Sequence, residues 1–180
     1  MHDDLEKILF THEQIHQRIA EVAAAISRDY EGRELMLVAV LKGAVFFLTH
    51  LAEALTVPAQ IDFLGIASFS PGRVLPGVVR ISKDLDLDIL DKEVLVIEDI
   101  VDTGLTLRYL LNILSGRQPR SLAVCTFLDK PTRRLVEIPV RYSCFEVPDR
   151  FVVGFGLDYN QQYRTLPCVG ILRSHIYQGK

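Results

Sequence analysis

Long hydrophobic runs, repeats, low-complexity tracts and an excess of basic residues are all lacking from this chain of 180 residues. No apolar run approaches the roughly 20 residues that a membrane-spanning helix needs, which argues against a membrane protein. The N-terminal segment MHDDLEKILF is acidic and lacks the basic and then apolar layout of a secretion signal. The formal net charge of −3 gives the surface as a whole no attraction for nucleic acid or anionic lipid, so any phosphate binding is expected to be local.

Cysteine is scarce, and its positions argue against two common uses. Cys125, Cys144 and Cys168 are odd in number, and no two of them have the close spacing of zinc ligands or of a redox pair. They are expected to be reduced, packed thiols in a cytoplasmic protein. The composition is 49% hydrophobic and 24% charged, and no linker interrupts it, so one domain over residues 1–180 is the simplest organisation.

The chain does contain a regular alternation of short apolar runs and amphipathic stretches. Its first helix begins clearly, because Thr11 and Gln14 form a capping box ahead of apolar residues at helical spacing. The alternation predicts an α/β fold with a mainly parallel, twisted sheet flanked by helices, in which ligands gather at the carboxyl ends of the strands. Strands are predicted at residues 34–41, 61–69, 78–83, 93–98 and 121–128, an apolar run lies at 151–155, and helices are predicted at 44–55 and 105–114.

Residues 94–107, VLVIEDIVDTGLTL, carry the clearest chemistry. A buried strand leads through an acidic pair into a turn with glycine and two threonines at the start of a helix. Backbone N–H groups at a helix N-terminus bind anions, helped by the helix dipole, and Thr103 and Thr106 add hydroxyl donors. The segment is therefore a candidate phosphate site, although it lacks the lysine of a Walker loop and is not G-x-G-x-x-G.

The acidic pair Glu98–Asp99 restricts the kind of ligand that this site could bind. Two carboxylates beside a phosphate site would repel a bare polyphosphate, but they suit a ligand that presents hydroxyl groups or brings Mg²⁺. A ribose 5-phosphate meets both conditions. The alternative is an acidic turn that only caps the next helix, which explains aspartate and glycine but not the pair.

Residues 97–106, IEDIVDTGLT, resemble the phosphoribosyl pyrophosphate signature of the type I phosphoribosyltransferases, and the neighbouring motifs resemble the hypoxanthine-guanine branch from about residue 8 to 172. The resemblance implies that family's sheet with a small hood near the C-terminus and a mobile lid hairpin, dimeric or tetrameric assembly, and transfer of a phosphoribosyl group to a 6-oxopurine. Asp102 would then be the acid/base at purine N7, since the base must lose a proton as it attacks the sugar. Glu98 and Asp99 would bind the ribose hydroxyls and Mg²⁺, and Asp102, Thr103, Gly104, Leu105 and Thr106 would hold the 5-phosphate.

The resemblance assigns the other ends of the two substrates to further motifs. The pyrophosphate would lie against Lys42–Gly43, whose Leu41–Lys42 peptide is typically cis in the family, and against Arg164. Alone, each of these residues reads as an ordinary solvated cation at a turn. The purine would meet Lys130 at O6, Phe151 as a stacking ring, the Val152 backbone at its edge, and Asp158, which could also bind a second Mg²⁺.

The lid departs from the family pattern. A serine-tyrosine pair is usual there, whereas this chain has Ser68–Phe69 in front of the turn-rich segment at 70–77. The segment is still expected to exclude water from the reacting centre. The missing hydroxyl puts any ligand contact that the tyrosine makes in doubt.

Two alternatives remain open at this stage. His12-Glu13-Gln14-Ile15-His16 matches the H-E-x-x-H motif of zinc hydrolases, but it lies in the first turns of a helix whose apolar stripe already explains it. Some proteins with this fold are RNA-binding regulators, which the purine-side residues and the lack of a basic surface disfavour. The aspartates at 84, 86 and 88 mimic the start of an EF-hand, but its glycine and final glutamate are missing.

Overall fold

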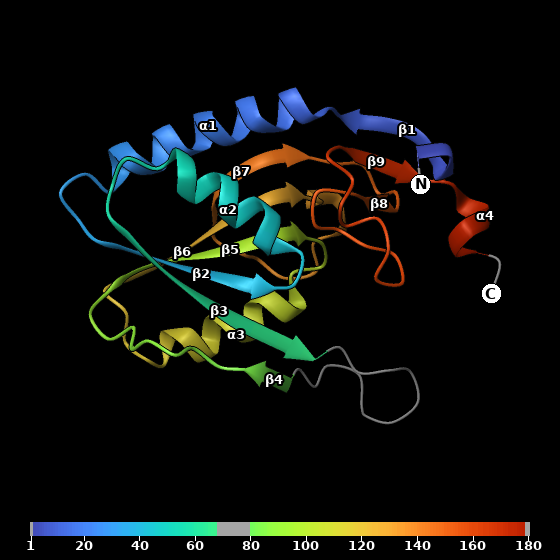
Figure 1. Ribbon diagram of the computed structural model, residues 1–180. Helices are drawn as coiled ribbons and strands as arrows, with labels where there is room; N and C mark the ends of the chain where they lie inside the picture. Colours follow the sequence, from blue (N-terminus) through green and yellow to red (C-terminus); the bar gives the residue numbers. More distant parts are fainter. Residues whose placement is uncertain (1, 68–79, 179–180) are drawn as a thin grey trace.

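The computed structural model describes residues 2–67 and 80–178, arranged as one mixed sheet between helices with a smaller sheet beside it (Figure 1). The larger sheet has the order β4-β3-β2-β5-β6-β7, in which only β4 is antiparallel to its neighbour. This confirms the predicted mainly parallel α/β fold. Its strands are β2 (Leu35–Leu41), β3 (Ala59–Ala67), β4 (Arg80–Lys83), β5 (Glu93–Val101), β6 (Ser121–Asp129) and β7 (Val140–Glu146).

Alternate residues of the central strands face two separate layers of the core. On one face, α1 (His12–Asp29) and α2 (Ala44–Ala54) pack on Leu35, Leu37 and Ala39 of β2. On the other face, α3 (Leu105–Ser115) packs with Met36, Val38 and Val40 of the same strand. Because every residue from Leu35 to Val40 is buried, β2 reads as a continuous apolar run, as strands covered on both faces do.

The ends of two elements test the sequence predictions closely. Thr11 caps α1 as predicted, since its hydroxyl accepts from the Gln14 N–H while the Gln14 side chain accepts from the Thr11 N–H. The strand predicted at 93–98 is longer than expected. β5 continues to Val101, because Ile100 and Val101 pair with Leu128 and Asp129 of β6, so the acidic pair lies within the strand and not after it.

A second sheet of three antiparallel strands, in the order β1-β9-β8, joins the two ends of the chain. β1 (Leu5–Phe10) was not predicted, because only one of its six residues is fully buried and no alternation marks it. It pairs with β9 (Val169–Leu172), which in turn pairs with β8 (Val152–Val153), so the apolar run predicted at 151–155 forms only a two-residue strand. The remaining elements are short: η1 (His2–Asp4), η2 (Pro131–Arg133) and α4 (Ser174–Tyr177).

The three cysteines are free and buried, as predicted. Within the described part of the chain, no helix is long and apolar enough to cross a bilayer. The proposed lid residues Ser68 and Phe69, with the whole of the turn-rich segment at 70–77, lie outside the described residues. The strand predicted at 78–83 is present from Arg80 to Lys83, antiparallel to β3.

Candidate active site

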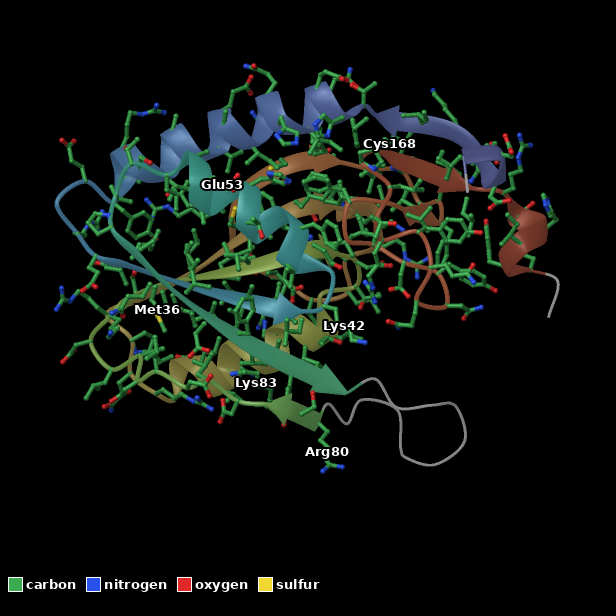
Figure 2. All side chains as sticks on the ribbon, in the orientation of Figure 1. Met36, Lys42, Glu53, Arg80, Lys83 and Cys168 are labelled. Atoms are coloured by element: carbon green, nitrogen blue, oxygen red, sulfur yellow. The ribbon has the colours of Figure 1, made fainter. Side chains whose placement is uncertain are left out.

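The strand order of the large sheet reverses between β2 and β5, since the chain runs outward from β2 to β3 and later returns to the other side of β2. Ligand sites in open α/β sheets form at such a point, outside the carboxyl ends of the strands. Lys42 lies at this end of β2 (Figure 2), and the Leu41–Lys42 peptide is cis, as the family resemblance implied. The end of β5 carries the acidic pair and leads into the threonine-glycine turn.

A hollow of about 190 Å³ lies over this turn. Gly104 ends the turn in the left-handed region, with φ 81°, and becomes the N-cap of α3. The first N–H groups of a helix have no acceptor within it, so they are free to bind an anion placed there. The hollow is lined by Val40, Ile66, Glu98, Ile100, Val101, Asp102, Thr103, Gly104, Thr106 and Leu107.

Without a ligand, the surroundings of the acidic pair disfavour the ionised form of both carboxyl groups. Burial and the neighbouring Asp99 raise the pKa of Glu98 well above its usual range. Burial likewise raises the pKa of Asp99 to about 6, although backbone N–H groups and the Arg164 guanidinium oppose the change. Two desolvated carboxyls of this kind favour a positive ion beside them.

The fit to Mg²⁺ follows from the same pair. Among residues 2–67 and 80–178, no three His, Cys, Asp or Glu side chains gather in a way that could hold a metal by themselves. Mg²⁺ is usually bound by one or two carboxylates together with ligand phosphates and waters, and not by an all-protein cage. Glu98 and Asp99 therefore suit a magnesium ion that arrives with a phosphorylated ligand.

Gly43 is required by the position of Asp99. A Cβ atom at residue 43 would lie 1.6 Å from Asp99 Oδ2, and the space it would occupy is already filled by that carboxylate. The close approach brings the peptide between β2 and α2 directly against the acidic end of β5. The sequence showed an unhindered backbone at this turn but gave no sign of what approaches it.

A second hollow of about 230 Å³ adjoins the first, and Ile100 and Asp102 line both. Lys130 is buried here at 7% exposure, with Nζ donating to the Arg150 carbonyl at 2.9 Å. Burial lowers the pKa of Lys130, while the carboxylates of Asp102 and Asp149 act in the opposite direction. The other lining residues are Asp99, Phe151, Val152, Leu157 and Asp158.

Phe151 keeps an exposed face at this hollow. Its ring is 36% exposed and stacks on Tyr177, with centroids 5.0 Å apart and an interplanar angle of 25°. Tyr159 meets it edge-on at 5.6 Å. An aromatic ring supported in this way is suited to stacking on a flat ligand.

Arg164 and Asp158, which were predicted separately, form an ion pair at 2.7 Å. Arg164 also donates to the Gly156 carbonyl at 2.6 Å, and Gln161 accepts from both Arg164 and Lys42. The two predicted pyrophosphate residues thus lie at one place, linked by one amide. Of the predicted site residues that the structure describes, Leu105 is 52% exposed and lines neither hollow, and the others lie along the two hollows or beside them.

Arg133 is a neighbour of the site that the sequence reasoning did not single out. Its Nε donates to Asp102 Oδ1 at 2.7 Å, and its NH1 donates to Asp149 at 3.1 Å. The sequence signal was its place three residues after Lys130 in a turn opened by Pro131. That signal gives the turn but not the partner.

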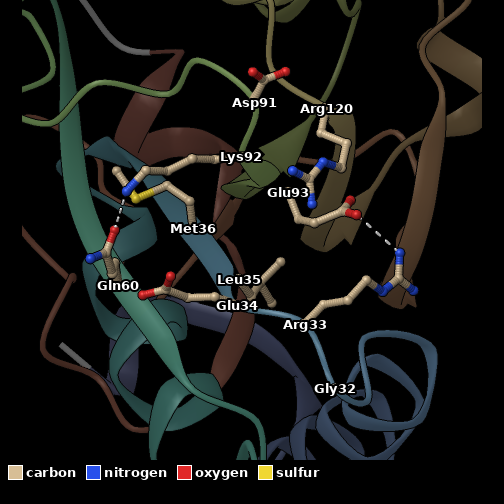
Figure 3. A pocket seen from close by; sticks show the side chains of 10 residues that line it. All are labelled: Gly32, Arg33, Glu34, Leu35, Met36, Gln60, Asp91, Lys92, Glu93 and Arg120. Carbon is tan, nitrogen blue, oxygen red and sulfur yellow. Dashed lines mark hydrogen bonds and ion pairs between the residues drawn. The ribbon is translucent and has the colours of Figure 1, made fainter.

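A third hollow, of about 260 Å³, lies at the opposite, amino edge of the sheet (Figure 3). Three of its charged side chains, those of Arg33, Lys92 and Glu93, bind other residues of its lining. Arg33 pairs with Glu93 at 3.2 Å, and Lys92 donates to Gln60 at 2.7 Å. Hydrogen bonds from Ser121 and Arg33 lower the pKa of Glu93.

The H-E-x-x-H histidines also come together, but not around a metal site. The rings of His12 and His16 lie 4.1 Å apart, and His50 of α2 packs on His16 at 4.4 Å. Burial and the two neighbouring histidines lower the pKa of His16. His50 stacks on Phe155, so the cluster forms part of the packing between α1, α2 and the glycine-flanked turn at 154–156.

Two adjoining hollows lie over the switch point of an α/β sheet, one at a helix N-terminus and one beside a buried lysine and an aromatic ring. This is the arrangement expected of an enzyme that binds a phosphorylated ligand and a flat ring. Residues 7–160 match the family described as phosphoribosyl transferase domain, and the chain belongs to this family of transferases.

Similar proteins indicate which branch of the phosphoribosyltransferases this chain resembles. The chain is 47% identical over 181 residues to the hypoxanthine-guanine phosphoribosyltransferase of Mycobacterium avium, an alignment that covers 97% of this chain and 89% of that protein. It is 42% identical to the enzyme of the same name from Streptococcus agalactiae, covering 98% of both chains. A crystal structure of a hypoxanthine phosphoribosyltransferase from Staphylococcus aureus has a TM-score of 0.93 and 41% identity, covering 98% of this chain and 96% of that chain. These comparisons support neither the zinc-hydrolase nor the RNA-binding alternative.

Proposed function

We propose that the protein transfers the 5-phosphoribosyl group from phosphoribosyl pyrophosphate to N9 of hypoxanthine or guanine, giving the nucleoside monophosphate and pyrophosphate. The observation that carries the proposal is the pair of hollows that share Asp102. One offers helix N–H groups and hydroxyls for a phosphate, and the other offers a buried lysine and an exposed ring for a base. The names of the relatives agree with it.

In the phosphate hollow, residues 102–106 would hold the 5-phosphate, and Glu98 and Asp99 would accept from the ribose hydroxyls. Bound Mg²⁺ would neutralise the charge on the pyrophosphate and the two carboxylates. Lys42, Gly43 and Arg164 would receive the pyrophosphate, because their cations and N–H group lie together at the end of β2. Binding there would require Arg164 to exchange Asp158 for the anion.

In the base hollow, Lys130 would donate to purine O6. An amino group at the same ring position presents donors to a donor, so the lysine would select oxopurines over adenine. Phe151 would stack on the ring, and Val152 and Asp158 would meet its far edge.

The proposed chemical step breaks the bond between ribose C1 and the pyrophosphate oxygen, and pyrophosphate leaves with the electron pair. Purine N9 forms the new bond to C1. The proton on N7 passes to the Asp102 carboxylate, which lies on the wall that both hollows share.

A base panel tests the function. Purified protein with phosphoribosyl pyrophosphate and Mg²⁺ is given hypoxanthine, guanine, xanthine, adenine or uracil, and nucleotide formation is followed. We expect turnover of hypoxanthine or guanine that stops on addition of EDTA and returns with excess Mg²⁺. Absence of turnover with every base would refute the activity, and EDTA-resistant turnover would refute the role of the metal.

We further propose that the enzyme works in the cytoplasm as a homo-dimer or homo-tetramer, as the family resemblance implies. Light scattering coupled to gel filtration would measure the mass of the assembly in solution. A monomer at working concentration would contradict this part of the proposal.

A further inference from the structure

Asp102 is the predicted catalytic residue, and its carboxylate already accepts a hydrogen bond from another side chain. Arg133 Nε donates to Asp102 Oδ1 at 2.7 Å, and no hydrogen bond to Oδ2 is present among the described residues. The two oxygens therefore differ. One is fixed by a cation, and the other is free on a side chain that lines both hollows.

Arg133 is itself fixed from two directions. Its NH1 donates to Asp149 at 3.1 Å. Its backbone N–H closes the η2 turn on the Lys130 carbonyl at 3.1 Å, and the Lys130 N–H binds the Val101 carbonyl at 3.0 Å, next to Asp102. A single turn thus carries the lysine that enters the base hollow and the arginine that holds the acid/base carboxylate.

Arg133 lines neither hollow, so it approaches the carboxylate from outside the site. Its side chain is 44% exposed, and that of Asp102 is 41% exposed. Ion pairs this exposed contribute little to stability. Stabilisation of the fold is therefore a poor explanation for the geometry, whereas orientation of one carboxylate oxygen accounts for it.

From this geometry we infer that Arg133 is a positioning residue for the phosphoribosyl transfer: it holds Asp102 Oδ1 so that Oδ2 is presented, ionised, to the purine ring nitrogen. Asp149 in turn orients Arg133. The inference rests on the proposed function, because it assigns no role to Arg133 unless Asp102 receives the purine proton. A cation beside the carboxylate favours its charged form and, by constraining it, shortens the search for a productive hydrogen bond.

The test compares three variants with the wild type. Arg133→Gln removes the charge, Arg133→Lys keeps it, and Arg141→Gln is the matched control. Arg141 pairs with Asp29 at 2.9 Å, and their side chains are 45% and 42% exposed, close to the values of the Arg133 pair, but this pair involves no predicted site residue. The readouts are the single-turnover rate of nucleotide formation and the KM values of both substrates.

We expect Arg133→Gln to lower the single-turnover rate about tenfold, a part of the 10²–10⁴ that a complete acid/base is worth. The KM for phosphoribosyl pyrophosphate should stay within about twofold, since Arg133 lines neither hollow and its replacement leaves the backbone N–H groups of residues 102–106 in place. Arg133→Lys should recover most of the rate, and Arg141→Gln should match the wild type.

A double variant separates positioning from a general disturbance. If Arg133 acts through Asp102, Arg133→Gln should cause no further loss in an Asp102→Asn background. A further loss there, an unchanged single-turnover rate in Arg133→Gln, or a faster rate in that variant would each overturn the inference. Failure of the proposed function is recognised independently, because the wild type itself would then form no purine nucleotide.

Discussion

The two ends of strand β5 carry the same kind of side chain in opposite conditions. Glu93 at the amino edge and Glu98 at the carboxyl edge are both buried, at 6% and 8% exposure. Ser121 and Arg33 bind Glu93 and lower its pKa, whereas Glu98 has Asp99 as its charged neighbour and a raised pKa. The buried carboxylate at the amino edge is therefore paired within the protein. The buried carboxyl at the carboxyl edge lacks such a partner and is available to a ligand. The single hollow at the amino edge, of about 260 Å³, is larger than either of the two adjoining hollows at the carboxyl edge, of about 190 and 230 Å³, so the state of the charges distinguishes the edges better than the volume of one hollow does.

The largest difference between the edges should appear in turnover. Asp102→Asn removes the proposed proton acceptor and should lower turnover about 10²–10⁴-fold with a milder loss of substrate binding. Asp91→Asn is the matched change at the amino-edge hollow, where asparagine tolerates the φ of 55° that Asp91 adopts. Steady-state kinetics on both variants measures the contrast. Near-normal turnover in Asp102→Asn would remove its acid/base role, and a comparable loss in Asp91→Asn would remove the contrast.

Stability should respond in opposite directions at the two edges. At pH 7, Glu93→Gln should lower the free energy of unfolding by about 1–3 kcal/mol, because it breaks charged hydrogen bonds in a buried place. Glu98→Gln should raise the stability of the ligand-free protein by on the order of 1 kcal/mol, because it removes a desolvated carboxyl, and should impair substrate binding. Urea unfolding of each variant measures both. A loss of stability in Glu98→Gln would mean that its carboxyl is already satisfied.

The pH dependence of this difference has a definite sign. The lowered pKa of Glu93 gives stability that is present above its unfolded value and lost as pH falls through the folded value. The raised pKa values of Glu98 and Asp99 give stability that is present below their unfolded values and lost as pH rises, for Asp99 through about 6. The ligand-free protein should therefore weaken between about pH 4 and 6, and Asp99→Asn should reduce this loss of stability to the part that Glu98 contributes. An unchanged pH profile in Asp99→Asn would contradict the raised pKa.

The smallest contrast compares two glycines. Gly43→Ala would place a methyl group 1.6 Å from Asp99 Oδ2 and push the carboxylate away, which should weaken phosphoribosyl pyrophosphate binding about tenfold. Gly32→Ala meets nothing within 4 Å but keeps a φ of +71°, so it should cost about 1 kcal/mol of stability and no affinity. Calorimetric titration and thermal unfolding distinguish the two effects. Equal affinity in both variants would show that the contact with Asp99 does not matter for binding.

The sequence predicted those parts of the fold whose cause is local. The capping box placed the start of α1, and unbroken apolar runs placed β2 and β6, because burial on both faces leaves that pattern. β1 left no pattern, since its partner β9 lies at the other end of the chain and most of its residues stay exposed.

The features of the site likewise divide into those with a local cause, which the sequence predicts, and those that depend on distant residues. The turn at residues 102–106 is readable because one segment supplies all its donors. The burial of Lys130 and its contact with the Arg150 carbonyl arise only when residues 20 positions apart meet, and the partner of Arg133 is 31 positions away. Neither contact leaves a trace in the local sequence. The roles of these residues remain predictions.

The pairing of β1 with β9 has a consequence for the order in which the enzyme is assembled. Leu5 lies opposite Leu172, so β1 cannot pair until residues far later in the sequence have been synthesised. Contacts between such distant segments form late, because the intervening loop must close first. The residues that line the phosphate hollow end at Leu107 in the sequence, whereas Val152 of the base hollow lies in β8, whose partner among the described strands is β9. We therefore expect the lining of the phosphate hollow to be synthesised first, and the base hollow to be completed only after β9 has been made.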